Sequence, residues 1–133
     1  MINTLLVEDN SIFRSRFGAF LRNQWPSIRI DEAWSEDQVF YLVDNNLHDV
    51  IFMDISLPGT NGLGLTRKIK SGYPHIKIII LTGHDEIEYF DAAKDAGADH
   101  FFTKDNFHKA NIVDIMKTVV AEKNLTTTNR TLQ

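Results

Sequence analysis

Short apolar runs that end in a polar or charged residue alternate along this chain with longer stretches of helical periodicity. No other feature constrains the fold as strongly, because such apolar runs are typical of strands buried on both faces of a parallel sheet. A strand followed by a helix occurs five times in this pattern, which favours right-handed crossovers and helices on both faces of the sheet. The sequence therefore predicts an α/β fold, a single doubly wound (βα)5 domain.

Each predicted strand is rich in β-branched and apolar residues and stops at a polar or turn position. The strands are expected at 4–7, 28–33, 50–53, 76–81 and 100–103. Helical spacing of apolar residues, with start and stop signals near several of the ends, predicts five helices that include 12–21, 36–43, 62–71, 85–97 and 112–120. Ser35 and Gln38 form a capping box before the second helix, and Asp85 is the expected N-cap of the fourth.

Composition restricts the classes of function. The length of 133 residues suits one domain, and the sequence contains no internal repeat. A net charge of −4 argues against nucleic acid or an anionic membrane as a partner of this domain. The absence of cysteine removes disulfides, thiolate zinc sites and thiol nucleophiles. The first residues do not resemble a signal peptide, and no apolar run is long enough to span a bilayer, so a cytoplasmic location is expected.

A change in composition marks the end of the predicted domain. After Lys123 the residues are polar and rich in threonine and asparagine, as in a linker. The sequence therefore predicts a domain over 1–123 and, over 124–133, a polar tail or the start of a linker.

Reactive side chains follow four of the five predicted strands. Glu8 and Asp9 follow the first strand, Asp54 the third, Thr82 the fourth and Lys104 the fifth. In open α/β sheets, ligands bind beyond the carboxyl ends of the strands. If the strands lie in the order 2-1-3-4-5, these four strand ends are neighbours, and their side chains converge on one cleft.

These residue types suit phosphoryl transfer. Three carboxylates without histidine or cysteine favour Mg²⁺, which bridges carboxylates to phosphate oxygens. Lys104 adds a positive charge, Thr82 adds a hydroxyl group, and Asp54 is the central carboxylate that can act as the nucleophile and form an aspartyl phosphate. Each residue alone has an ordinary explanation as a cap, a turn residue or a surface charge, so the argument depends on their combination.

The chain resembles the receiver domain of two-component response regulators over almost its whole length, to about residue 123. The resemblance rests on four motifs: LLVEDN at 5–10, MDISLPGTNG at 53–62, LTG at 81–83 and GADHFFTK at 97–104. It implies a flavodoxin-like fold with the parallel sheet order 2-1-3-4-5.

The resemblance also implies a role for each site residue. Asp54 is expected to accept a phosphoryl group from a sensor histidine kinase or a phosphotransfer protein. Glu8, Asp9, Asp54 and the backbone carbonyl of Ser56 are expected to hold Mg²⁺, while Thr82 and Lys104 contact the phosphoryl oxygens. The domain would thus be no enzyme in the usual sense, because it catalyses only its own phosphorylation and dephosphorylation.

A switch is implied as well. In the family, the residue at Thr82 moves inward and the aromatic ring at Phe101 rotates, which changes the face formed by the fourth and fifth strands and controls an output. A simple core aromatic is the alternative interpretation of Phe101. Ser56 and His84 flank the expected phosphate and are candidates for tuning its lifetime.

The output is expected to be transcription regulation through a DNA-binding domain that this chain does not contain. Lys104-Asp105 is similar to receivers of the group with a LuxR-type output, and phosphorylation is expected to allow a homodimer. Many receivers have proline after this lysine, usually with a cis bond, so the geometry of the bond between Lys104 and Asp105 stays open.

Two alternatives compete with this interpretation. A stand-alone receiver would act by protein–protein contact, without a DNA-binding domain. A haloacid-dehalogenase-like phosphatase uses similar residues but needs a second acid two positions after its nucleophile, where this chain has Ser56. The second alternative is therefore the weaker.

Overall fold

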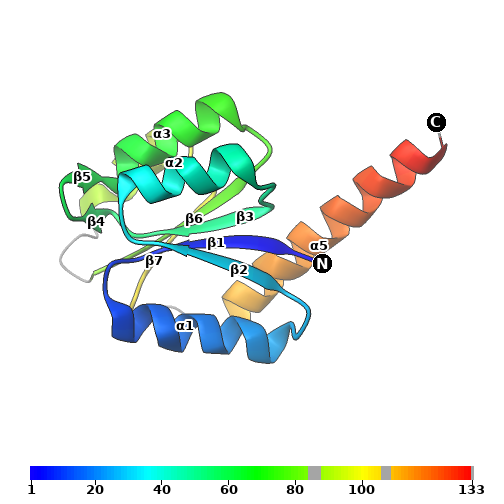
Figure 1. Cartoon of the computed structure of the whole chain (residues 1–133), viewed down its shortest axis with the longest axis horizontal. Helices are drawn as coiled ribbons and strands as arrows, with labels where there is room; N and C mark the ends of the chain where they lie inside the picture. The colour runs from blue at the N-terminus through cyan, green and yellow to red at the C-terminus, as the bar shows by residue number, and fades with distance from the viewer. Residues whose placement is uncertain (84–87, 106–108, 133) are drawn as a thin grey trace.

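The computed structural model describes the backbone of residues 1–83, 88–105 and 109–132, and the side chains of these ranges as far as residue 124. Within them, the main sheet has the order β2-β1-β3-β6-β7, and all neighbouring strands are parallel (Figure 1). Its strands are β1 (Asn3–Val7), β2 (Arg29–Ala33), β3 (Val50–Met53), β6 (Lys77–Thr82) and β7 (His100–Thr103). The order 2-1-3-4-5 for the five predicted strands is confirmed.

Helices cover both faces of this sheet. They are α1 (Ser11–Gln24), α2 (Glu36–Asn45), α3 (Gly62–Gly72), α4 (Phe90–Asp95) and α5 (Lys109–Leu132). Alternate residues of the strands point to opposite faces, so the core has two halves. Leu5 and Val7 pack with α2, α3 and α4, whereas Leu6 packs with α1 and α5. Figure 1 shows α2 and α3 on one side of the sheet and α1 on the other.

Two helix starts follow the local signals in the sequence. The side chain of Asn10 accepts a hydrogen bond from the backbone N–H of Phe13 and caps α1. Ser35 caps α2 by accepting from the N–H of Gln38, as the capping box predicts. The side chain of Gln38 accepts from the N–H of Trp34, one residue before the cap. The connection between β2 and α2 is thereby fixed by side-chain to backbone hydrogen bonds.

The turn cluster before α3 contains more structure than the sequence predicts. Two short strands, β4 (Ser56–Leu57) and β5 (Thr60–Asn61), pair as an antiparallel hairpin. Gly59 lies at its tip with a φ of +72°, a conformation that suits glycine. The sequence predicts a turn there but gives no sign of pairing, because each strand has only two residues.

The fourth helix is shorter than the predicted segment 85–97. Its α-helical part begins at Phe90 and ends at Asp95, and Gly97 follows with a φ of +102°, in agreement with the predicted glycine stop. Asp85, the expected N-cap, lies outside the described residues.

The last helix is longer than predicted. It continues to Leu132, whereas the sequence favours a linker-like segment after Lys123. No glycine or proline interrupts 109–132, so the helical backbone can continue where the apolar stripe has stopped. Figure 1 shows the final turns of α5 extending beyond the sheet. The division between a domain over 1–123 and a tail over 124–133 stays a prediction.

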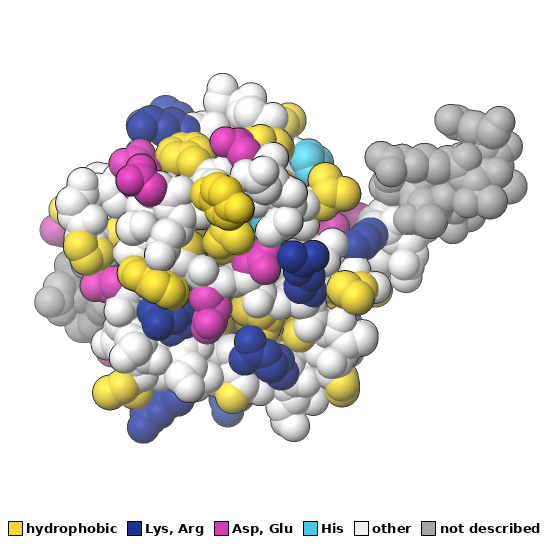
Figure 2. Space-filling model, in the orientation of Figure 1, with side chains coloured by type: hydrophobic (Ala, Val, Ile, Leu, Met, Phe, Trp, Pro, Cys, Tyr) yellow, Lys and Arg dark blue, Asp and Glu magenta, His cyan; other side chains and the backbone are white. Residues whose placement is uncertain are grey.

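The surface carries mixed charge. Figure 2 shows acidic, basic and apolar side chains interspersed over one face of the molecule. Among the described residues, no helix is long and apolar enough to cross a membrane.

Candidate functional site

The backbone of the sheet carries the predicted site residues to one edge. Glu8 N–H donates to the carbonyl of Ala33, and Asp54 N–H donates to the carbonyl of Val7, at 2.9 and 3.0 Å. Lys104 N–H donates to the carbonyl of Thr82 at 2.7 Å. Each of these residues therefore extends the hydrogen bonding of the parallel sheet by one step past the end of its strand, which fixes its position relative to the neighbouring strand.

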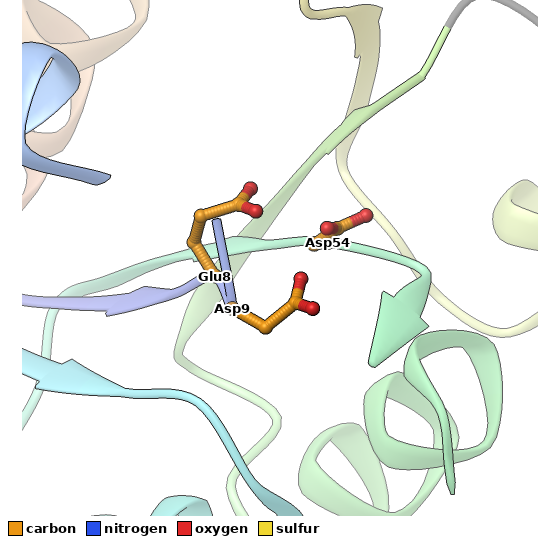
Figure 3. Close-up of side chains that lie close together, drawn as sticks. All are labelled: Glu8, Asp9 and Asp54. Atoms are coloured by element: carbon orange, nitrogen blue, oxygen red, sulfur yellow. The ribbon is translucent and has the colours of Figure 1, made fainter. Parts of the chain in front are cut away.

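Three carboxylates meet at this edge. Glu8, Asp9 and Asp54 each offer an oxygen, and these oxygens all lie within 4.8 Å of one another. Figure 3 shows Glu8 and Asp9 at the end of β1 and Asp54 after β3, with the carboxylate groups of all three around a common space. Glu8 is 1% exposed and Asp54 4% exposed, while Asp9 is open to solvent. The cluster is therefore buried on one side and accessible on the other.

Lys104 bridges the two buried carboxylates. Its Nζ lies 2.7 Å from Oε2 of Glu8 and 3.1 Å from Oδ2 of Asp54. Two buried negative charges at such close range repel one another, and a buried charge is costly unless it is paired. The ammonium group supplies this pairing, so the lysine that follows β7 stabilises the acids that follow β1 and β3.

The second oxygen of each buried acid accepts a local backbone hydrogen bond. Oε1 of Glu8 accepts from the N–H of Asn10 at 2.9 Å, and Oδ1 of Asp54 accepts from the N–H of Ser56 at 3.1 Å. Both carboxylates are thus held at one oxygen by the residue two positions later and at the other by Lys104. This arrangement fixes the orientation of the carboxylate planes.

The pKa values of the site reflect burial and the close charges. Burial raises the pKa of Glu8 to about 7, which the hydrogen bond from Lys104 lowers in part and the Asp54 charge raises further. Burial also raises the pKa of Asp54, against the opposing effect of the Lys104 charge. Burial on its own would lower the pKa of Lys104, but the hydrogen bond to Glu8 and the charge of Asp54 raise it. The ammonium form of Lys104 is therefore the stable one beside these acids.

The other predicted residues occupy different surroundings. Thr82 is buried at the end of β6 and pairs in register with Thr103 of β7. Ser56 is exposed beside Asp54. Phe101 is half-buried against the core, and its ring packs edge to face on Phe90 at 5.5 Å. His84 lies outside the described residues.

The described residues include no cis peptide bond, so the bond between Lys104 and Asp105 is trans.

A hollow of about 620 Å³ opens beside the carboxylates, and its lining includes Asp9, Ser56, Asn61 and Tyr89. The hairpin of β4 and β5 and the residues just before α4 therefore border this hollow.

Sequence reasoning missed two residues of α1 that contact the site. Arg14 Nη1 donates to the backbone carbonyl of Glu8 at 2.7 Å, and its guanidinium group lies over the ring of Trp34. The ring of Phe13 lies against the Nζ of Lys104. Both residues lie in the first half of α1, the helix that follows the acid pair, and this proximity is the signal that could have pointed to them. The spacing of apolar residues alone identifies Phe13 only as a core residue.

A parallel sheet of this order, with an acid cluster and a lysine at its carboxyl edge, defines the class of flavodoxin-like α/β domains whose site lies beyond the carboxyl ends of the strands. The chain belongs to the response regulator receiver domain family, whose family model matches residues 4–117. It therefore functions in phosphorelay signalling.

Curated relatives support this family assignment. The chain is 35% identical over 104 residues to the response regulator UvrY of Escherichia coli K12, a match that covers 78% of this chain and 48% of UvrY. It is 31% identical over 100 residues to the transcriptional activator protein ExaE of Pseudomonas putida, covering 75% of this chain and 47% of ExaE. The chain thus spans about half the length of these relatives.

Solved structures share the fold. The signal receiver domain of the DNA-binding response regulator MerR from Colwellia psychrerythraea superposes with a TM-score of 0.84 at 24% identity, covering 91% of this chain and 99% of that one. The response regulator TrrA of Thermotoga maritima, solved in complex with Mg²⁺ and BeF, has a TM-score of 0.77 at 25% identity, covering 90% of this chain and 99% of TrrA.

Proposed function

We propose that Asp54 accepts a phosphoryl group from the phosphohistidine of a sensor histidine kinase or a phosphotransfer protein. The observation that carries the proposal is the pair of contacts to its carboxylate, the Ser56 N–H on Oδ1 and the Lys104 ammonium on Oδ2. A carboxylate held in this way is oriented for attack while its charge is balanced.

The donor set at the site fits Mg²⁺. Glu8, Asp9 and Asp54 offer carboxylate oxygens, the ligands that this ion prefers, and the exposed side of the cluster leaves room for the waters that it retains. Glu8, Asp9, Asp54 and the backbone carbonyl of Ser56 are the proposed ligands. When bound, the ion supplies positive charge that offsets repulsion between the carboxylates and the phosphoryl oxygens.

The residues of this chain have distinct parts in the reaction. An oxygen of Asp54 forms a bond to phosphorus while the bond from phosphorus to the histidine nitrogen of the donor breaks, and the imidazole leaves with the electron pair of that bond. Lys104, already beside Asp54, can pair with a phosphoryl oxygen without a large movement. Thr82 is proposed to donate its hydroxyl hydrogen to another. Ser56 and His84 are proposed to tune access of water and hence the lifetime of the phosphate.

The proposed product is the chain phosphorylated at Asp54, which acts as a signal. The chain is proposed to catalyse only its own phosphorylation and dephosphorylation. A movement of Thr82 and Phe101 would then change the face of β6 and β7, and a homodimer is proposed to form on phosphorylation.

The transcriptional activator among the relatives supports a DNA-binding output outside this chain. A stand-alone receiver that acts by protein contact is the alternative. A cytoplasmic location is proposed together with the histidine kinase partner.

Binding of beryllofluoride, a stable phosphoryl analogue, tests the proposed site. Fluorine NMR with the wild type should show a protein-bound signal that needs Mg²⁺. The signal should be lost in Asp54→Asn and weakened in Asp9→Asn, which removes a proposed metal ligand from the exposed side. Asp37→Asn, a matched change at an exposed acid of α2, should behave as the wild type. A bound signal that persists in Asp54→Asn would contradict the proposal.

A further inference from the structure

The ammonium group of Lys104 has a third neighbour besides its two carboxylates. Its Nζ lies over the ring of Phe13, 4.9 Å from the centroid, within the range of a cation–π interaction. The side chain of Lys104 is 21% exposed, so little water competes for this ammonium group. Partial burial strengthens the attraction between a cation and the face of an aromatic ring.

The ring of Phe13 is itself held in place. It stacks on Phe17 with the centroids 5.7 Å apart and the planes at 11°, and Phe17 packs edge to face on Phe52 of β3 at 4.9 Å. Phe17 and Phe52 are buried. The backbone N–H of Phe13 donates to the side chain of Asn10, the residue after the acid pair. A column of rings therefore connects the buried sheet to the ammonium group.

We propose that Phe13 is a positioning residue for Lys104, whose ammonium group it holds at the site through the electrostatic attraction of its ring face. The inference rests on the proposed function and deepens it. When Asp54 takes up a phosphoryl group, its contact with Lys104 changes, whereas the ring contact does not depend on the charge of Asp54. Phe13 thus offers the flexible lysine a fixed neighbour before and after the transfer.

Fluorination of the ring separates this role from simple packing. Fluorine atoms weaken the negative face of the ring with little change in size, so a series of 4-fluoro, 3,5-difluoro and 3,4,5-trifluorophenylalanine at position 13 should slow phosphorylation in steps. We expect a total loss of about fivefold in the rate with acetyl phosphate and Mg²⁺, followed by intact mass. Phe13→Leu should be slowed at least as much.

A matched control exists on the same helix. Phe20 is half-buried on α1, lies near Phe17, and has the Nζ of Lys109 at 5.5 Å from its ring centroid, away from the carboxylates. The same fluorine series at Phe20 should leave the rate unchanged. The series at Phe13 should also lose its effect in a Lys104→Met background.

A second readout needs neither metal nor phosphate. Protons on the ε-carbon of Lys104 should resonate upfield in the NMR spectrum because they lie near the ring face, and Phe13→Leu should abolish that shift. The positioning role alone would be overturned if the wild type is phosphorylated but fluorination at Phe13 leaves the phosphorylation rate unchanged. An equal effect of fluorination at Phe20 would overturn it as well. A wild type that takes up no phosphoryl group would overturn the proposed function, and the role of Phe13 in it, even if the upfield shift were present.

Discussion

At the scale of single residues, the site is a balance between two buried acids and one lysine. Glu8 and Asp54 each give one oxygen to a backbone N–H and one to Lys104. Lys104 provides one positive charge for two carboxylates, so burial keeps both acid pKa values raised. Without a further cation, the folded protein therefore holds protons at this site that the unfolded chain releases.

This balance predicts how stability depends on pH in metal-free buffer. The pKa of Glu8 is about 7 in the folded protein against 4.5 for the unperturbed group. A raised folded pKa stabilises the fold fully below pH 4.5, and this stabilisation is lost as the pH rises through about 7. Denaturant unfolding with EDTA should show a free energy of unfolding that falls over this window, by at most about 1.4 kcal/mol per pH unit for one proton.

The Glu8→Gln variant is the control for that prediction. It removes the titrating group while keeping a side chain of the same size, so its stability should fall less over the same window. Asp54, whose pKa is also raised, contributes in the same direction and leaves part of the slope. Parallel stability curves for the wild type and Glu8→Gln would show that Glu8 does not titrate in this range.

The sequence could predict the positions of the acids and the lysine but not all of their contacts. Glu8, Asp54 and Lys104 follow strands, and parallel strands bring their carboxyl ends to one edge, so strand pattern suffices to place them. Phe13 could not be assigned in this way. Its contact with Lys104 depends on the rotation of α1 about its own axis, which is set by packing of Phe17 against Phe52 in the folded core.

At the scale of elements, the connection from β3 to α3 determines how the loop after Asp54 is supported. The N–H of Gly62, the first residue of α3, donates to the carbonyl of Ile55 at 2.9 Å. A Cβ atom at Gly62 would lie 2.2 Å from the backbone oxygen of Asp54 and 2.8 Å from Cα of Ile55. The helix therefore starts directly against the backbone of Asp54.

Substitution of this glycine should damage both stability and phosphorylation. In Gly62→Ala the methyl group collides with backbone that cannot yield cheaply, so we expect a loss of about 1–3 kcal/mol in the free energy of unfolding, and a slower phosphorylation because Asp54 is displaced. Gly64→Ala is the matched control on the same helix, since nothing lies within 4 Å of its Cβ position. It should raise stability by up to about 1 kcal/mol. Equal effects of the two substitutions would contradict this description of the loop.

Prediction of the elements succeeded where periodicity or capping dominates and fell short where tertiary structure decides. The buried runs at β3 and β6 and the Ser35 cap are local signals, and the structure confirms them. The hairpin of β4 and β5 depends on how the chain folds back over Asp54 and has no pattern of its own. The helix α5 continues past Lys123 because no glycine or proline stops it there. The spacing of apolar residues marks only the part of a helix that packs on the core, so it does not predict this continuation.

At the scale of the whole molecule, the two edges of the sheet have different tasks. The carboxyl edge carries the acids and Lys104, while the opposite edge is closed by contacts of α5 with the start of the chain. Lys123 Nζ contacts Oδ2 of Asp49 at 3.0 Å and donates to the carbonyl of Met1 at 2.6 Å. Oδ2 of Asp49 also accepts from the N–H of Asn3 at 2.8 Å. Lys123 of α5 is thus anchored at the edge of the sheet that lies opposite the carboxylate cluster.

A shortened chain tests where the domain ends. A protein that stops after Asn124 keeps Lys123 and its contacts, so its melting temperature should change by no more than about 2 °C, and its phosphorylation rate should match that of the full chain. The further variant Lys123→Ala in the shortened chain should lower stability by about 1 kcal/mol or less, because the pair is partly exposed. A shortened chain that unfolds or loses phosphorylation would place residues 125–133 within the domain.

The central claim is that Asp54 is the phosphoacceptor of a receiver domain, and intact mass after incubation with acetyl phosphate tests it most directly. The wild type and the Asp37→Asn control should each gain the mass of one phosphoryl group with Mg²⁺ and none after removal of the ion with EDTA. Asp54→Asn should gain none under either condition. Addition of a phosphoryl group to folded Asp54→Asn at the wild-type rate would contradict the account.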